Sequence, residues 1–572
     1  MAAVRDGTVV FCQSEERINR IKNALCFPAQ TVDFVYQHLI DPASVASVTV
    51  FSKDPRSYLM LKANDFRPSR FGGPVDRAEV NRWLADPVEA DRYYVKNRIL
   101  ETAMAQHVPL QREAAEFVAG RTRVPVERVA FLDHHLGHAY SALPFLDPLE
   151  GPVLIFTLDG EGDAVCATVN LWSGGTLETL AVTPDLCSLG KIYMYVTGML
   201  GFTMNEHEYK VMGLAPYAKP EYCRDLREHF DKLMWIDDDG LWQSSFVSLP
   251  QLVMRLADLT QFQRFDAIAG ALQSFTEDLI LKWIGHWVRR TGIRRVACAG
   301  GVFMNVKANQ RIAEIDTVER YVIVPSCADE STAIGCAVAG SLGNEPNRPI
   351  RPLRHLYLGW SFDDAAVEEA LHARGGSGPY DVLTPPDLPD AIASLLAEGA
   401  IVARCTGPME FGARALGNRS ILADPRRADT VAFINQAVKN RDFWMPFAPT
   451  VLDDAFDDLV VDPGRTDAAF MMVSYDATAR GRSDLVAAQH RADFTLRPQR
   501  LRREANPEYH ALIEAFRART GVGAVLNTSF NLHGYPIVGT PEVAIDTLKK
   551  SELDAVALGP ILVTKDRQSN GK

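Results

Sequence analysis

The sequence has 572 residues, a formal net charge of −12, and ordinary proportions of hydrophobic (47%) and charged (23%) residues. A chain of this length is too long for one ordinary core, so we expect two to four domains. Its acidic balance argues against a nucleic-acid-binding surface, and no stretch reaches the roughly 18 apolar residues of a membrane helix. Nucleic acids and membranes are therefore not expected partners.

Nine cysteines are scattered along the chain, and no two are spaced as CxxC. This pattern indicates neither a disulfide framework nor a zinc ribbon. The start, MAAVRDGTVVFCQSEE, also lacks the basic and apolar regions of a signal peptide. We therefore expect a protein of the reducing cytoplasm.

The first predicted element is a strand that gives way to a helix, with Glu15, Glu16, Arg17 and Arg20 at the change of period. Charged residues at a helix start are usually solvated, because acids there already match the helix dipole. The chain opens almost directly on this strand, whereas a mixed sheet normally offers a preceding partner strand. This beginning suggests that a segment is missing upstream of this start.

The segment VAFLDHHLGHA places His134 and His138 four residues apart after a short apolar strand. If a helix begins near His134, the two imidazoles lie on one face, close enough to share a metal ion. A pair of hydrogen-bonded histidines at a strand end is the alternative. Asp159 lies where the strand GPVLIFTL ends, and Asp329 lies near a helix N-terminus, where it also suits a cap. Together the two histidines and two aspartates form a mixed set that suits a divalent transition metal.

Two further segments of this half suggest binding surfaces. One segment is apolar and rich in Gly and Met, and it contains the polar residues Tyr193, His207 and Lys210. Such a segment is typical of either a pocket wall or a buried helix pair. A long core helix over residues 266–290 then leads into a strand that ends at Gly300 and Gly301, ahead of a helix that includes Asn305. Such a turn can bind phosphate, although most are only turns.

A segment dense in Gly, Pro, Asn and Arg, residues 340–355, marks a domain boundary. Cations gather soon after it in an otherwise acidic chain and would suit a polyphosphate; they are Arg404, Arg414, Arg419, Arg426, Lys439 and Arg441. Nearer the C-terminus, Asn527, Thr528, Ser529 and Asn531 occupy a strand where hydrophobic residues would normally sit, which indicates a ligand-facing strand.

Taken in order, these segments resemble the O-carbamoyltransferases of the NodU/CmcH type over nearly the whole chain. The resemblance rests on SEERINRIK, HHLGHAYSA, LDGEGD, HEYKVMGLAPYA, CAGGVFMNVKAN, ADESTAIG, GPMEFGARALGNRSILADPR, VKNRDFWMPFAP and NTSFNLHGYPIV. It implies an α/β protein with an actin-like ATPase-fold (ASKHA, threonylcarbamoyl-transferase-like) domain at residues 1–345 and a YrdC-like domain at residues 350–572.

The resemblance also implies a reaction. Carbamoyl phosphate and ATP, with Mg²⁺, would give carbamoyl-adenylate in the YrdC-like domain, and the carbamoyl group would then pass to an alcohol at the metal-containing domain. The implied metal ligands are His134, His138, Asp159 and Asp329, with Fe(II) as the expected ion and His138 also counted as catalytic. The implied adenylate-forming set is Arg414, Arg419, Lys439, Arg497 and Ser529, with Asn527 beside it and Met471 or Met472 near the adenine.

One departure concerns the acceptor side, because members of this family usually begin with a strand and a histidine-containing motif, and this chain starts after it. Either translation begins upstream, or His207, Glu208 or Lys210 serves the acceptor hydroxyl. The apolar wall around Tyr193 suggests a bulky natural product, as in antibiotic tailoring, and a homodimer is the default oligomer.

Three other functions remain open. They are a tRNA threonylcarbamoyl-type transferase, which should show a basic face, a hydrogenase-maturation carbamoyltransferase, which should carry CxxC zinc modules, and an actin-fold small-molecule kinase or binding module, which would leave the cationic C-terminal domain unexplained.

Overall fold

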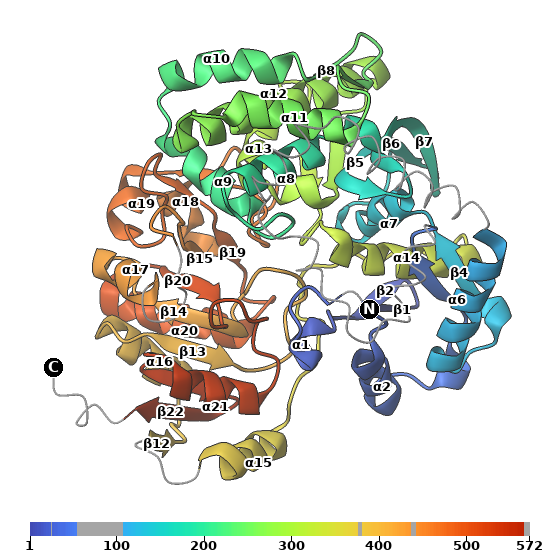
Figure 1. Ribbon diagram of the computed structural model, residues 1–572. Coiled ribbons are helices and arrows are strands. Elements are labelled where there is room, and N and C mark those ends of the chain that lie inside the picture. The colour runs from blue at the N-terminus through green and yellow to red at the C-terminus, as the bar shows by residue number, and fades with distance from the viewer. Residues whose placement is uncertain (25, 54–106, 376–379, 436–441, 566–572) are drawn as a thin grey trace. The chain divides into compact units, whose positions relative to one another are not determined.

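The computed structural model describes residues 1–24, 26–53, 107–375, 380–435 and 442–565 (Figure 1). The chain forms two compact units. The N-terminal unit comprises Ala2–Val9 and Ala24–Pro352, and the C-terminal unit comprises Met1, Val10–Asn23 and Leu353–Lys572. Among the described residues, no helix combines the length and apolarity needed to cross a membrane.

A mixed five-stranded sheet, in the order β11-β10-β5-β6-β7, forms the centre of the N-terminal unit. β5 (Val153–Gly162), β6 (Val165–Ser173) and β7 (Thr176–Pro184) form an antiparallel meander, and β10 (Arg295–Ala299) and β11 (Arg320–Ile323) run parallel to β5. The first six residues of β5 are buried, as expected for a central strand.

The predicted long core helix is confirmed as α12 (Phe265–Thr291), which ends at Gly292 in the left-handed conformation (φ 72°). Its apolar residues recur at helical spacing, and Trp283 packs edge-on against Phe156 of β5, with ring centroids 4.9 Å apart. Figure 1 shows α12, in green, beside α10 (Pro220–Asp231). The helix therefore covers the central strand of this sheet.

Helices α7 (His134–Ser141) and α14 (Thr332–Asn344) pack against each other in the N-terminal unit. Helix α14 also contacts β3 (Val48–Phe51), which pairs in parallel with β4 (Val129–Leu132). Within the described residues, this unit also contains β1 (Ala2–Arg5), α2 (Ala29–His38), α6 (His107–Thr122), α8 (Leu189–Met199), α9 (Glu208–Leu214), β8 (Met234–Ile236), β9 (Trp242–Ser244), α11 (Leu249–Thr260) and α13 (Val306–Arg311).

An eight-stranded mixed sheet, in the order β12-β22-β21-β13-β14-β20-β15-β19, organises the C-terminal unit. Its strands are β12 (Tyr380–Leu383), β13 (Val402–Cys405), β14 (Arg419–Ala423), β15 (Ala448–Leu452), β19 (Gln499–Leu501), β20 (Ala524–Ser529), β21 (Ala555–Leu558) and β22 (Ile561–Lys565). A small sheet contains β16 (Val460–Val461), β17 (Tyr475–Ala477) and β18 (Thr495–Leu496).

Helices α15 (Asp364–Gly375), α16 (Leu388–Ala397), α17 (Ala428–Ile434), α20 (Pro507–Thr520) and α21 (Pro541–Lys550) lie on the larger sheet. Helices α18 (Phe456–Leu459) and α19 (Ala479–Asp484) pack on each other and on the small sheet. One face of the larger sheet carries the apolar core, with Ile421 and Leu526 packed near Ile545 of α21. The other face carries polar residues, because β-strand side chains alternate and Arg404 aligns with Ser420, which aligns with Ser529.

The segment Val10–Asn23, which includes the end of β2 (Thr8–Cys12) and α1 (Glu16–Asn19), belongs to the C-terminal unit. Cys12 N donates to Leu358 O at 3.1 Å, and Trp360 N donates to Gln13 Oε1 at 2.7 Å. The expected boundaries, residues 1–345 and 350–572, assigned this segment to the first domain. The difference arises because its hydrogen-bond partners lie more than 300 residues away in the sequence.

Candidate functional site

The start of α7 sets the two histidines on one helix face. Asp133 caps the helix by accepting from Leu136 N at 3.0 Å. The Nε2 atoms of His134 and His138 lie 3.1 Å apart. His135 points elsewhere: its Nδ1 lies 2.7 Å from Thr157 Oγ1 and its Nε2 lies 3.0 Å from Val165 O. The i, i+4 pair therefore faces a common point, and His135 is fixed to the sheet instead.

Asp159 faces this pair from the point where β5 loses register with β6, between Leu158 and Gly162. Its Oδ1 accepts from Gly160 N at 2.7 Å and from Gly301 N at 3.3 Å. Its Oδ2 lies 3.2 Å from His134 Nε2 and 3.1 Å from His138 Nε2. The backbone groups thus hold one carboxylate oxygen and aim the other at the histidines.

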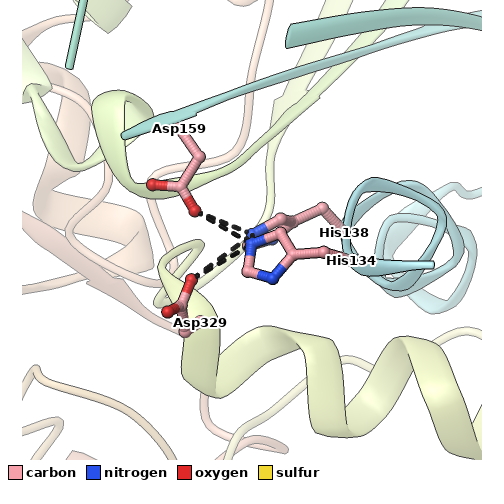
Figure 2. A group of neighbouring side chains, drawn as sticks. All are labelled: His134, His138, Asp159 and Asp329. Carbon is pink, nitrogen blue, oxygen red and sulfur yellow. Dashed lines mark hydrogen bonds and ion pairs between the residues drawn. The ribbon is translucent and has the colours of Figure 1, made fainter. Parts of the chain in front are cut away.

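Asp329 completes the group from the short 3₁₀ turn Asp329–Ser331 that leads into α14 (Figure 2). Its Oδ1 lies 3.4 Å from His134 Nε2 and 3.6 Å from His138 Nε2. The Asp329 side chain is 58% exposed, whereas that of His138 is fully buried. The cluster is therefore closed on the α7 side and open beside Asp329.

The four side chains fit a divalent metal ion. Each offers one ligand atom, and these atoms all lie within 4.8 Å of one another. Metal–ligand bonds of about 2.0–2.2 Å place neighbouring ligands about 2.8–3.6 Å apart, which matches the measured histidine–carboxylate distances. Burial alone would lower the pKa of His134, but Asp329 and Asp159 raise this pKa well above its ordinary value. The protein therefore concentrates opposite charges at a point where one cation could satisfy them.

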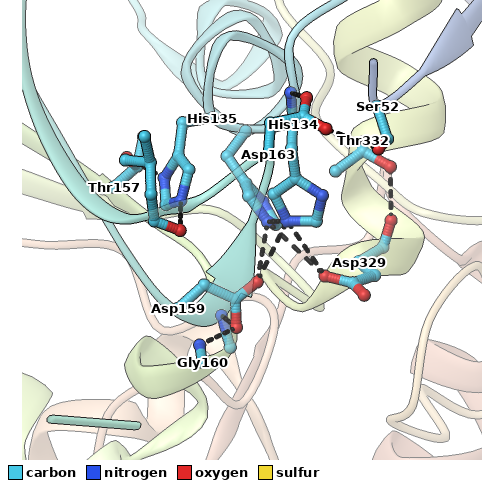
Figure 3. Close-up of polar contacts among 12 residues, drawn as sticks. Ser52, His134, His135, Thr157, Asp159, Gly160, Asp163, Asp329 and Thr332 are labelled. Atoms are coloured by element: carbon cyan, nitrogen blue, oxygen red, sulfur yellow. Dashed lines mark hydrogen bonds and ion pairs between the residues drawn. The ribbon is translucent and has the colours of Figure 1, made fainter. Parts of the chain in front are cut away.

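A second layer of hydrogen bonds fixes this group (Figure 3). Asp163 accepts from His134 N at 2.8 Å and from Ser52 Oγ at 2.7 Å. Thr332 Oγ1 donates to Asp329 O at 2.6 Å. Such outer contacts orient metal-binding side chains in known sites.

The predicted phosphate-binding turn has internal partners in this structure. Gly300 N donates to Cys327 O at 2.8 Å, and Gly301 N donates to Asp159 Oδ1. Asn305 caps α13 through Ala308 N and exchanges hydrogen bonds with Gln273. These groups hold the cluster and neighbouring helices together, a role that the sequence pattern did not reveal.

The predicted acceptor-side residues lie on α8 and at α9. Tyr193 is buried, and its hydroxyl donates to Gln273 Oε1 at 2.9 Å. Lys210 Nζ lies 5.4 Å from the centroid of the Phe202 ring. His207 Nδ1 accepts from Thr203 N at 3.2 Å, so the neutral ring carries its proton on Nε2. In that form, His207 Nε2 can donate a hydrogen bond but cannot accept a proton.

In the C-terminal unit, a buried carboxylate that sequence reasoning missed shapes the loop of residues 406–418. Glu410 is 2% exposed, and its Oε1 accepts from the backbone N–H groups of Leu416, Asn418 and Arg419 at 2.8, 3.1 and 3.1 Å. This loop carries Arg414. Glu410 therefore ties the loop to the start of β14.

Among the predicted cations, Arg404 and Arg426 form ion pairs, whereas Arg419 bonds to backbone carbonyl groups. Arg404 is fully buried, donating to Gly417 O and Glu508 Oε1, and Arg426 pairs with Asp424. Arg419 is 1% exposed and donates from Nη1 to Thr406 O, at 2.8 Å, and to two further carbonyl groups. These contacts make Arg404 and Arg426 structural ion-pair members. Lys439 and Arg441 lie outside the described residues.

The other residues predicted to bind the nucleotide also belong to the C-terminal unit. Arg414 and Arg497 are half-buried. Ser529 Oγ donates to Asn531 Oδ1 at 2.7 Å, whereas Asn527 donates from Nδ2 to Ala415 O and Thr450 Oγ1 and so joins the loop to the sheet. Met471 is buried and adopts φ 57°, a conformation that is costly for a non-glycine residue, and Met472 beside it is also buried.

Comparisons with known proteins match two long segments of the chain to family models. The family model described as "Carbamoyltransferase N-terminus" matches residues 1–338, and "Carbamoyltransferase C-terminus" matches residues 393–565. The nodulation protein NolNO of Sinorhizobium fredii is 32% identical over 98% of this chain and 78% of its own length. The 3'-hydroxymethylcephem-O-carbamoyltransferase of Amycolatopsis lactamdurans is 31% identical over 41% of this chain and 42% of its own.

Among solved structures, HypF of T. kodakarensis covers 41% of this chain and 39% of its own at 16% identity, with a TM-score of 0.26. A likeness this weak carries no functional argument. The two family models and the long NolNO match do support a family assignment, because together they span almost every motif described above. The chain therefore belongs to the carbamoyltransferase family of the NodU/CmcH type.

Proposed function

We propose that the protein is an ATP-dependent O-carbamoyltransferase that works in two stages. Carbamoyl phosphate, ATP and one water would give carbamoyl-adenylate, pyrophosphate and inorganic phosphate in a YrdC-like C-terminal unit. The carbamoyl group would then pass to a hydroxyl of a natural product in the actin-like N-terminal unit. Activation is needed because a carbamoyl group is a poor electrophile until it carries a good leaving group, and AMP is one.

The observation that carries this proposal is the cluster of His134, His138, Asp159 and Asp329 in a carbamoyltransferase family member. When bound there, a divalent ion such as Fe(II) supplies Lewis-acid polarisation of a carbonyl group. His134, His138, Asp159 and Asp329 would hold the ion, and the exposed Asp329 side leaves room for a substrate. Tyr193 and Lys210 would contact the acceptor, and His207 would donate a hydrogen bond to it through Nε2.

In the first stage, cationic side chains would offset the charge that develops on the phosphates. Arg414, Arg497 and Lys439 are the proposed phosphate ligands, with Mg²⁺, and Ser529 would contact the nucleotide. Arg419 donates from Nη1 to carbonyl groups of the loop of residues 406–418. Its proposed contribution is to fix this loop, while its other nitrogen atoms would face the phosphates. Met471 or Met472 would contact the adenine.

The test is to mix purified protein with ATP, Mg²⁺ and carbamoyl phosphate, without an acceptor, and to measure pyrophosphate. We expect pyrophosphate that depends on carbamoyl phosphate, together with carbamoyl-adenylate or AMP. Formation of ADP instead would support the kinase reading. Tight nucleotide binding with no turnover would support a binding module, and either result would overturn the proposal.

A further inference from the structure

The segment Val10–Asn23 is attached to the C-terminal unit by two arginines. Arg17 is 3% exposed and donates from Nη2 to Gly412 O at 2.5 Å. Arg20 donates from Nη1 to Ile537 O at 2.6 Å and from Nη2 to Pro536 O at 2.9 Å. A guanidinium offers its donors in a rigid fork, so these contacts set the positions of the carbonyl groups they reach. One short helix, α1, therefore holds two separate loops.

The first loop carries Arg414. Gly412, which accepts from Arg17, lies two residues before it in the segment of residues 406–418. Glu410 holds the other end of the same loop through three backbone N–H groups. Arg17 and Glu410 thus fix the loop on both sides of Arg414.

The second loop follows Ser529. Pro536 and Ile537 accept from Arg20, and the next residue, Val538, donates from its backbone N to Phe530 O at 2.8 Å. Phe530 N in turn donates to Arg419 O at 2.9 Å. Hydrogen bonds therefore connect Arg20 to the strand ends that carry Ser529 and Arg419.

Close backbone packing shows that this attachment is built into the fold. A Cβ at Gly539 would lie 2.1 Å from the carbonyl oxygen of Arg17, so only glycine permits this approach. Arg20 itself adopts φ 61° at the C-terminus of α1, a conformation that is uncommon for a non-glycine residue. The guanidinium contacts and the glycine contact point to one fixed position for α1.

We infer that Arg17 is a positioning residue of the adenylate-forming site and that, with Arg20, it sets the geometry between the Arg414 loop and the Ser529 loop. The inference rests on the function proposed above for the C-terminal unit. It makes the motif SEERINR part of the first half-reaction, although the motif lies at the opposite end of the sequence from the arginines it serves.

The experiment uses the full-length protein with Arg17→Met, Arg17→Lys and Arg20→Met, and with Arg503→Met as the matched control. Arg503 pairs with Glu514 on the exposed surface of the same unit. Carbamoyl phosphate-dependent pyrophosphate release is measured against ATP concentration, and the rate is normalised to the folded fraction from a thermal melt. Bound metal is measured in parallel, because the four-residue cluster belongs to the other unit.

For Arg17→Met, we expect kcat/KM for ATP to fall by about a hundredfold, as when catalytic groups are misplaced by about 1 Å. Arg17→Lys should recover part of the loss, since one donor can still reach Gly412 O, while bound metal and the Arg503→Met rates stay unchanged. An unchanged kcat/KM in soluble Arg17→Met, with wild-type protein active, would overturn the inference alone. If Arg17→Met does not fold, the kcat/KM for ATP of Arg20→Met decides, and an unchanged value would overturn the inference. An inactive wild type would instead overturn the proposed function itself.

Discussion

Gly335 of α14 packs directly on the backbone of Gly137 of α7. A Cβ at residue 335 would lie 1.7 Å from the Gly137 carbonyl oxygen, which no L side chain can accommodate. This contact brings the turn that carries Asp329, just before α14, to the face of α7 that carries His134 and His138. The glycine pair therefore sets the width of the four-residue cluster.

Replacing Gly335 with Ala should separate the two helices and pull Asp329 away from the histidines. We expect a loss of about 1–3 kcal/mol in the free energy of unfolding, as for other overpacked sites, and weaker metal binding. Gly343→Ala in the same helix is the control, because a Cβ there meets nothing within 4 Å. Thermal melts and metal titrations measure both effects. Equal metal affinity in the two variants would disprove this role for the glycine contact.

His138→Ala should abolish stoichiometric metal binding. The ring is fully buried and its Nε2 lies 3.1 Å from both His134 Nε2 and Asp159 Oδ2, so the loss of this ligand leaves a gap in the set. We expect metal affinity to fall by more than about a hundredfold, beyond the effect of losing an outer-sphere contact. Elemental analysis and titration with Fe²⁺ or Zn²⁺ measure the change.

His135→Gln is the matched control for His138→Ala, because it alters a neighbouring buried histidine that bonds to Thr157 and Val165 instead. It should cost about 1–3 kcal/mol of stability while keeping one metal per chain. Metal retained in His138→Ala, or lost in His135→Gln, would contradict the ligand assignment.

Removing the metal should separate the two half-reactions. We expect an iron-selective chelator, with Mg²⁺ in excess, to stop carbamoyl transfer while pyrophosphate formation continues, because the two sets of residues lie in different units. The melting temperature should also fall, since an ion at about 100 times its Kd stabilises a fold by about 2.7 kcal/mol. Loss of pyrophosphate formation on chelation, and its return with Fe²⁺, would show that the metal serves the first stage instead.

The sequence predicted the four-residue cluster well, because each member follows from a local rule. Histidines at i and i+4 share a helix face. Asp159 follows the buried part of a predicted strand, and Asp329 lies just before a predicted helix. The structure brings these four residues together. Their role as metal ligands stays a prediction.

The roles of the arginines were harder to predict, because the partner of a charge can lie anywhere in the chain. The sequence pattern places Arg404 among possible phosphate ligands, and in the structure its guanidinium pairs with Glu508, 104 residues later. Arg17 looked like a solvated helix-start residue, yet it bonds to Gly412 across 395 residues. Residue type and local spacing do not encode contacts at such separations, and so Glu410 was missed as well.

Glu410→Ala should unfold the Arg414 loop locally. Three backbone N–H groups would lose their acceptor in a buried setting, and each unsatisfied group costs about 1–3 kcal/mol, so we expect a total loss of at least about 3 kcal/mol. Glu410→Gln keeps an acceptor oxygen and should retain more than half of the stability lost by the Ala variant. Denaturant unfolding gives the free energies, and pyrophosphate release reports the loop. A Gln variant as damaged as the Ala variant would show that charge, rather than hydrogen bonding, is what the loop requires.

Arg414 and Arg426 lie twelve residues apart, and we expect them to have different roles. Arg426 is bound to the buried carboxylate of Asp424 by contacts of 2.6–3.2 Å, whereas half-buried Arg414 lies on the loop that Glu410 and Arg17 fix. Arg414→Ala should therefore lower the rate of pyrophosphate formation by about 10²–10³, as for removal of one group that stabilises developing charge. Arg426→Ala should reduce stability and leave the rate per folded molecule within about twofold, because Arg426 is not needed for the phosphates. Steady-state kinetics of both variants, with folded fractions from thermal melts, measure the difference. If Arg426→Ala lost activity as severely as Arg414→Ala, the cations would act together as one polyphosphate site, and the division between structural and phosphate-binding arginines would be wrong.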